Sequence, residues 1–167
     1  NVQSAADHVF ERVAKGEIDD ARGRAILTEY ASDLLATVRQ ESVPPERAWM
    51  YGDVFRTARR DDEARRFYRI AVDHAVKTKN EDRRVNDSIK LAGLLARVGR
   101  VEQAIALVRS TFDASPSGKA PILVGTYLEV VPEARGKGRD AELAKLIAEA
   151  IPQALDTLVD RESEGGK

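Results

Sequence analysis

The sequence predicts an all-α protein. Apolar residues recur every three or four positions along most of the 167 residues, and alternation with a period of two is sustained nowhere. The chain is 43% hydrophobic and only 5% aromatic, which disfavours an aromatic-rich sheet protein and favours a folded, water-soluble helical one. Short turns interrupt the helical pattern at nearly regular steps, so we expect antiparallel helical hairpins that repeat along the chain.

The first two hairpins are expected at about 2–40 and 45–77. Gly16 ends the first helix, and Asp19 or Asp20 caps a long second helix. Pro44 and Pro45 then break the chain, and Pro45 fits the first turn of a third helix, where its missing N–H costs nothing. Asp61 is the expected cap of the fourth helix.

The next two hairpins are expected at about 81–113 and 119–151. Asn80 caps the fifth helix and Gly99 ends it, and the sixth helix runs to a break at 115–118. The seventh helix ends before Pro132, and the eighth begins near Asp140. Pro152 either kinks this helix or opens a short capping helix over 152–161, and residues 162–167 are expected to be a frayed tail.

The turns between paired helices share a pattern. Gly16, Arg59, Gly99 and Gly138 hold the same place in four turns, at steps of 43, 40 and 39 residues. Small residues follow at or near the fifth position beyond them, which lets two antiparallel helices approach closely. These residues are Ala21, Ala64 and Ala104, with Leu143 beside Ala144 in the fourth turn.

In these features the chain resembles the tetratricopeptide repeat family, best over residues 45–116. A repeat beginning at Pro45 puts Gly52, Phe55, Ala64, Tyr68 and Ala71 on the small, large, alanine, aromatic and alanine positions of that family. A repeat beginning at Val85 puts Ala92, Leu95, Ala104, Val108 and Thr111 on the corresponding positions. The family's final proline position holds Pro116 in this repeat and Val76 in the first. The steps exceed the roughly 34 residues of the family, so we expect longer helices and an insert at 76–84. A helical-hairpin family of longer period is the alternative.

The resemblance implies a right-handed superhelix of about four hairpins, forming one domain over residues 1–161 with a concave groove. Such a groove binds a peptide or a partner helix and needs no catalysis. By the resemblance, the first helix of each repeat faces the groove. The residues expected to contact a partner are Glu46, Trp49, Asp53, Arg56, Asn86, Ile89, Lys90, Gly93 and Arg97. Trp49, the sole tryptophan, is the expected anchor, and ordinary packing between hairpins is its alternative role.

Catalytic, metal and cofactor sites are not expected. The absence of cysteine excludes disulfides, thiolate catalysis and cysteine-based zinc sites. His8 and His74 belong to no His-Glu-x-x-His pattern, and we interpret them as surface or boundary residues. Arginines in the middle of the chain are interleaved with acidic residues, which is typical of a solvated mixed face.

The charge balance and hydropathy narrow the choice of partner. With 27 basic and 28 acidic residues, the net charge is −1, so nucleic acid is not an expected partner. No apolar run approaches the roughly 20 residues that span a bilayer. The chain starts at Asn1 without a visible leader, which leaves a cytoplasmic protein and an exported mature form both open.

Two other functions stay open on the sequence alone. One is a regulatory or accessory helical domain of a larger enzyme or sensor, and the other is a compact helical enzyme whose site has no recognised motif. Self-association through the terminal helices is a third open point, because the end repeats of such arrays must cover their apolar faces.

Overall fold

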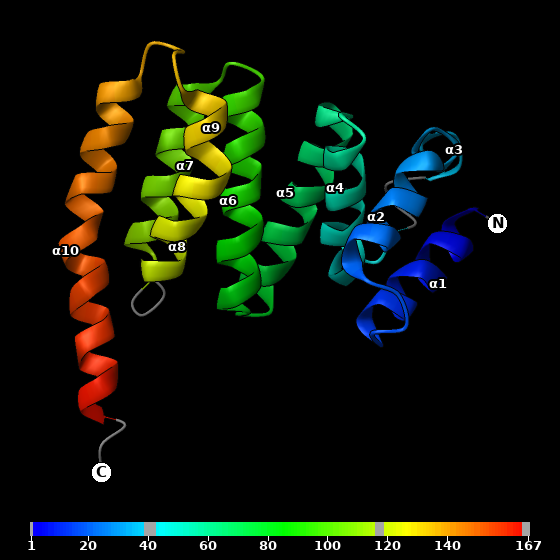
Figure 1. Ribbon diagram of the computed structural model, residues 1–167, viewed down its shortest axis with the longest axis horizontal. Coiled ribbons are helices and arrows are strands. Elements are labelled where there is room, and N and C mark those ends of the chain that lie inside the picture. The colour runs from blue at the N-terminus through cyan, green and yellow to red at the C-terminus, as the bar shows by residue number, and fades with distance from the viewer. Residues whose placement is uncertain (1, 39–42, 116–118, 165–167) are drawn as a thin grey trace. The chain divides into compact units, whose positions relative to one another are not determined.

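Helices make up all the regular structure in the part of the chain that the structure describes. This computed structural model describes residues 2–38, 43–115 and 119–164, and no strand occurs among them (Figure 1). The predicted all-α class is therefore confirmed. The chain divides into two compact units, Asn1–Ala71 and Val72–Lys167, and helix α5 (Asp61–Lys77) contributes to both.

Unit 1 begins with α1 (Val2–Ala14) and α2 (Asp20–Glu29). Asp19 caps α2 as predicted, because its side chain accepts a hydrogen bond of 2.8 Å from the Arg22 backbone N–H. The prediction of one long second helix is wrong, because the backbone leaves helical geometry at Tyr30 and α3 (Ala31–Thr37) follows as a separate element. This bend lets α2 and α3 both pack on α1. One straight helix in their place would contact α1 over a shorter length.

The second half of unit 1 contains η2 (Pro45–Arg47), α4 (Ala48–Thr57) and the start of α5. Pro45 opens the short 3₁₀ turn, in agreement with its predicted place. Asp61 is the first residue of α5 and not its cap, so its carboxylate lies in the first turn, where the helix dipole favours negative charge. Gly52 allows α4 and α5 to meet, because a Cβ there would lie 2.8 Å from the Tyr68 ring.

An aromatic cluster forms the core of unit 1. The Phe67 ring stacks on Tyr51 and on Phe55, with ring centroids 5.3 and 5.4 Å away, and Phe10 of α1 approaches Tyr51 at 6.0 Å. Tyr51, Phe55 and Phe67 are all buried. The cluster therefore joins α1, α4 and α5 into one packed body.

Unit 2 is built on α6 (Glu81–Arg97). This helix packs against α7 (Val101–Asp113) and against the run α8 (Lys119–Gly125), η3 (Thr126–Val130) and α9 (Val131–Ala134), which lies next to α7 (Figure 1). The last helix, α10 (Asp140–Glu164), packs against α8. Asn80 caps α6 as predicted, accepting a hydrogen bond of 3.0 Å from the Arg83 backbone N–H.

Two proline predictions in unit 2 need correction. The seventh helix does not end before Pro132, because η3 is a π-helical turn that continues into α9, and Pro132 lies in the first turn of α9. Pro152 opens no separate capping helix at 152–161, since α10 runs through it without interruption. Residues 162–164, expected to be frayed, are the last residues of α10, and residues 165–167 lie outside the described residues.

The repeat is long because its helices are long, whereas its turns are tight and alike. Arg59 has a φ of 59° and Gly99 a φ of 83°, so Arg59 does occupy a glycine-like position. Each turn also closes with a backbone hydrogen bond between residues five positions apart. The Arg60 N–H donates to Phe55 O at 2.8 Å, and the Arg100 N–H donates to Leu95 O at 2.8 Å. The expected insert at 76–84 is wrong: it consists of the end of α5, a tight turn at Lys79 with a φ of 55°, and the start of α6. Helices α5 and α6 have 17 residues each, and these long helices account for the 40-residue step.

Replacing Arg59 with glycine is expected to stabilise the protein. An L-residue with a side chain pays roughly 1 kcal/mol to hold a left-handed conformation, and glycine avoids that cost. We therefore expect Arg59→Gly to raise the free energy of unfolding by up to about 1 kcal/mol in urea denaturation. Arg60→Gly is the matched control, because Arg60 is not among the residues with positive φ, and it should give no gain. Equal effects of the two variants would contradict this account of the turn.

Candidate functional site

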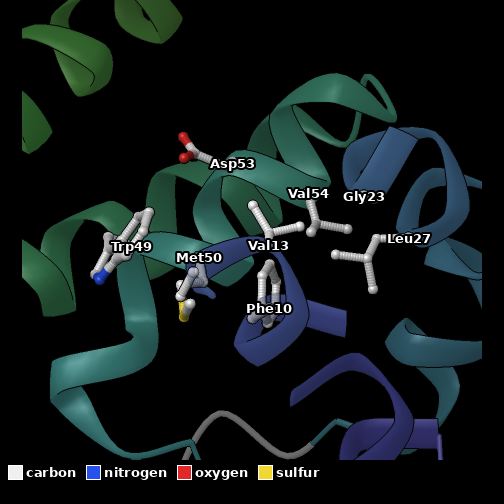
Figure 2. Close-up of a pocket in the computed structure, with 9 residues that line it drawn as sticks. Phe10, Val13, Gly23, Leu27, Trp49, Met50, Asp53 and Val54 are labelled. Atoms are coloured by element: carbon white, nitrogen blue, oxygen red, sulfur yellow. The ribbon is translucent and has the colours of Figure 1, made fainter. Parts of the chain in front are cut away.

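A cavity of about 150 Å³ lies in unit 1, between the α1–α2 hairpin and α4 (Figure 2). Its lining comes from Phe10, Val13 and Ala14 of α1, Gly23 and Leu27 of α2, and Trp49, Met50, Asp53 and Val54 of α4. Two of these residues, Trp49 and Asp53, are among the predicted partner-contacting residues. The structure therefore brings part of the predicted set to one concave site.

The cavity has a buried floor and a partly exposed rim. Leu27 and Val54 are buried, whereas Phe10, Val13, Trp49 and Met50 are each only partly covered. Figure 2 shows Phe10 and Val13 between Leu27 on one side and Trp49 and Met50 on the other. A ligand entering from the rim would thus meet apolar surface on several sides.

The position of α1 against α2 depends on Gly23. A Cβ at Gly23 would lie 2.4 Å from the Val13 Cγ2 atom, which is closer than side-chain atoms pack. The missing side chain lets Val13 reach the wall of the cavity. No pattern in the sequence distinguishes Gly23 or Met50, because their role depends on which helices meet. The apolar spacing of Phe10 and Val13 was visible in the sequence but indicated only a buried helix face.

Asp53 is the one charged side chain among the described residues that line the cavity. Its Oδ1 atom accepts a hydrogen bond from the Tyr68 hydroxyl group. The Tyr68 side chain is fully buried between α4 and α5, so its hydroxyl group has little freedom to move. This contact fixes a carboxylate at the edge of an apolar cavity.

The other predicted residues of unit 1 lie outside the cavity lining. Glu46 is exposed in η2, and Arg56 is partly buried one turn beyond Asp53 on α4. Partner contact through Glu46 and Arg56 stays a prediction.

The five predicted residues of unit 2 have different environments. Asn86 is exposed and Lys90 is partly exposed on α6. Ile89 is only 3% exposed and packs on Gly125, while Gly93 lies against η3, where a Cβ would approach the Glu129 carbonyl oxygen to 2.6 Å. Ile89 and Gly93 therefore belong to the packing between α6 and the α8–η3 run, and both residues are buried.

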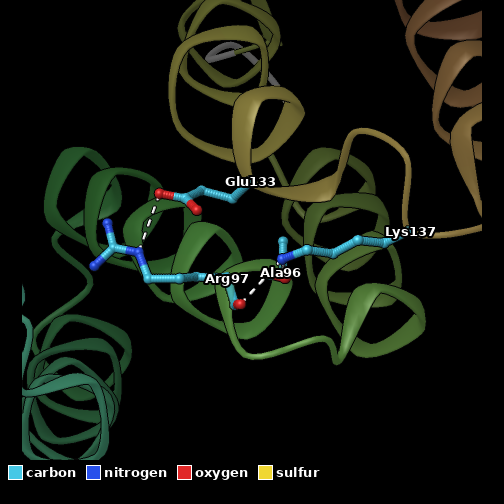
Figure 3. A network of polar contacts seen from close by, with 4 residues as sticks. All are labelled: Ala96, Arg97, Glu133 and Lys137. Carbon is cyan, nitrogen blue, oxygen red and sulfur yellow. Dashed lines mark hydrogen bonds and ion pairs between the residues drawn. The ribbon is translucent and has the colours of Figure 1, made fainter.

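Arg97, the last predicted residue, is part of a polar network at the end of α6 (Figure 3). Its Nε atom donates a 3.0 Å hydrogen bond to Glu133 of α9. Nearby, the Lys137 ammonium group donates to the carbonyl oxygens of Ala96 and Arg97, at 2.7 and 3.0 Å. Lys137 thereby satisfies backbone carbonyls that the end of α6 leaves without helical partners. The network joins α6 to the last hairpin.

A second exposed apolar surface lies on the outer side of α8 and η3. Val124, Tyr127 and Leu128 are 57%, 65% and 65% exposed, and their spacing puts them on one side of the helical run. Large apolar side chains gathered in this way are typical of surfaces that contact other molecules. We call these three residues the α8–η3 surface.

The described residues contain neither a metal-binding group nor a membrane-spanning helix. Among the described residues, no group of three or more histidine, aspartate or glutamate side chains could hold a metal ion. Within that same part of the chain, no helix is long and apolar enough to cross a membrane.

Comparison with known proteins gives no further constraint: no family model, no curated protein and no solved structure matches this chain.

Proposed function

We propose that this chain is a non-catalytic module that binds another protein, and that one apolar side chain of the partner enters the unit 1 cavity. The observation that carries the proposal is the size and lining of that cavity. A cavity of about 150 Å³ is the size that accepts a benzene ring in an apolar protein interior. Pockets for cofactors and drug-sized ligands are larger, at roughly 300–1,000 Å³. The volume thus suits one side chain of a peptide or partner helix.

The composition of the rim supports the same function. Trp49 and Met50 are partly exposed at its edge, and Phe10 faces them from α1. Tryptophan is enriched among the residues that carry most of the energy of protein–protein binding. Methionine adapts its shape to different apolar partners because its side chain is unbranched and flexible. The α8–η3 surface would offer a second contact area in unit 2.

We also propose that the hairpins form a tetratricopeptide-like array. The repeated turn geometry at Arg59 and Gly99 supports this, as does the close approach of Gly52 to the Tyr68 ring at the small and aromatic positions of the resemblance. Within unit 2, the packing of α6 against both α7 and the α8–α9 run is what stacked hairpins require. The 17-residue helices give a period of 40, so a longer-period hairpin family is the competing assignment.

Removing the Trp49 side chain is expected to weaken partner binding strongly. Trp49→Ala deletes one wall of the cavity, and a tryptophan anchor of this kind contributes about 2 kcal/mol or more, or roughly a 30-fold change in affinity. The test is affinity capture from cells of the source organism, followed by measurement of Kd for each captured protein. Because Trp49 is partly exposed, circular dichroism should show an unchanged helical signal.

The matched control is Tyr30→Ala, which removes another aromatic side chain of unit 1 that is 52% exposed and lies outside the cavity lining. A partner held by the cavity should bind Tyr30→Ala as it binds the unmodified chain. Equal capture by Trp49→Ala and the unmodified chain would refute the proposed role of the cavity.

A further inference from the structure

We propose that the unit 1 cavity selects a cationic ligand: an apolar side chain next to a lysine or arginine, with the positive charge placed against Asp53. This inference rests on the proposed function and adds the chemistry of the partner. It predicts a basic, amphipathic peptide segment as the bound element, and it disfavours an acidic one.

The first argument is charge. The lining is apolar except for Asp53, so one negative charge lies at the edge of a site that otherwise accepts hydrocarbon. A ligand that fills the cavity displaces water from these apolar walls and lowers the local dielectric, which strengthens the attraction between opposite charges. They equally raise the cost of bringing a second negative charge beside the carboxylate. An apolar group that carries a cation should therefore bind more tightly at this rim than a neutral one, and a group that carries an anion should bind more weakly.

The second argument is position. Tyr68 is fully buried, and its hydroxyl group donates to Asp53 Oδ1, so the carboxylate is held at the rim. An ionised carboxylate has about four acceptor positions, and it can accept hydrogen bonds from a ligand cation in addition to those it already makes. Tyr68 is thus a positioning residue for the charge that Asp53 presents.

The third argument is the neighbouring indole. Trp49 precedes Asp53 by one helical turn on α4, and both residues line the same cavity. A cation beside the Asp53 carboxylate would lie within the reach of the Trp49 side chain, and tryptophan is the aromatic side chain that attracts cations best. Ring and carboxylate would then favour the same sign of charge.

Three small molecules with the same phenyl ring test the inference. Phenethylamine is a cation at pH 7, phenethyl alcohol is neutral and 3-phenylpropionate is an anion. Trp49 is the sole tryptophan and lines the cavity, so its fluorescence reports the binding of each one to the full chain. We expect phenethylamine to bind about five- to tenfold more tightly than the alcohol, as for a charge-assisted hydrogen bond, and 3-phenylpropionate to bind most weakly.

Two variants identify the source of the preference. Asp53→Asn removes the charge but keeps an acceptor for the Tyr68 hydroxyl group, so it should bring the affinities for the amine and the alcohol within about twofold of each other. Tyr68→Phe keeps the ring and the charge but releases the carboxylate, so it should reduce the preference only in part. The urea unfolding transition of each variant, followed by circular dichroism, checks that the variant is folded.

The outcomes separate the inference from the proposed function. If the alcohol binds and the amine binds no better, or if the preference persists in Asp53→Asn, the charge selection is refuted and the cavity remains a binding site. If none of the three molecules changes Trp49 fluorescence, both the inference and the proposed role of the cavity are refuted.

Discussion

Replacing Gly93 with alanine is expected to destabilise unit 2 by about 1–3 kcal/mol, as overpacking of a close-packed contact does. A Cβ at this position would lie 2.6 Å from the carbonyl oxygen of Glu129. That oxygen belongs to the backbone of η3, so no side-chain rotation can relieve the clash. Helix α6 and η3 would have to separate, and the packing of Ile89 on Gly125 would loosen with them.

The sign of the effect makes this a strict test. In an isolated helix, replacing glycine with alanine stabilises by about 1 kcal/mol, because alanine has the higher helix propensity. The contact with η3 predicts the opposite sign. The midpoint of urea unfolding, followed by circular dichroism, measures the change.

Asn86→Ala on the exposed side of the same helix is the control, since it gains propensity without meeting another helix. A stabilised Gly93→Ala variant would show that α6 and η3 do not approach as closely as described.

Gly93 also illustrates what the sequence could not reveal. Its place in the repeat pattern predicted contact with a partner, because the resemblance assigns that helix position to a groove. In the structure a π-helical turn, Thr126–Val130, brings the Glu129 carbonyl oxygen against it instead. Such a turn inserts one extra residue into a helix and leaves no periodic signal in a single sequence. The prediction therefore failed on a contact between two elements, although the helix itself was predicted correctly.

Local features were predicted better than contacts between helices. Asp19 and Asn80 cap their helices, and Arg59 takes a glycine-like conformation, because caps and turns depend on a few neighbouring residues. The break at Tyr30 was missed, and of the two alternatives predicted for Pro152, the separate capping helix is wrong because α10 continues through it.

The candidate site divides in the same way. The α4 residues Trp49 and Asp53 could be found from the sequence, since they share one side of a single helix. The opposite wall, with Phe10 of α1 and Leu27 of α2, is set by how two hairpin elements meet α4, and Met50 joins the site through that packing. The buried donor to Asp53, Tyr68, lies 15 residues further along the chain and was predicted only as a repeat position.

Truncating Phe67 to alanine is expected to have the largest effect on unit 1. Phe67 is 4% exposed and stacks on both Tyr51 and Phe55, so Phe67→Ala removes the central ring of the aromatic cluster and leaves a cavity. Substitutions of this kind cost about 3–5 kcal/mol. That is a large fraction of the 5–15 kcal/mol that stabilises a typical domain.

Trp49 provides the measurement for this variant, because the only tryptophan of the chain lies in unit 1. We expect the midpoint of its fluorescence transition to move to a much lower urea concentration. The control Tyr30→Ala, which removes a 52% exposed ring, should change the free energy of unfolding by less than about 0.5 kcal/mol. Circular dichroism of the same samples follows both units.

In Phe67→Ala, the fluorescence transition and the circular dichroism transition can shift differently or alike. A shift in fluorescence without the same shift in the whole helical signal would show that the two units unfold separately. Identical shifts would show that they unfold together. A fluorescence transition that stays in place would contradict the central role of Phe67, and with it the packing that holds Phe10 and α4 on either side of the cavity.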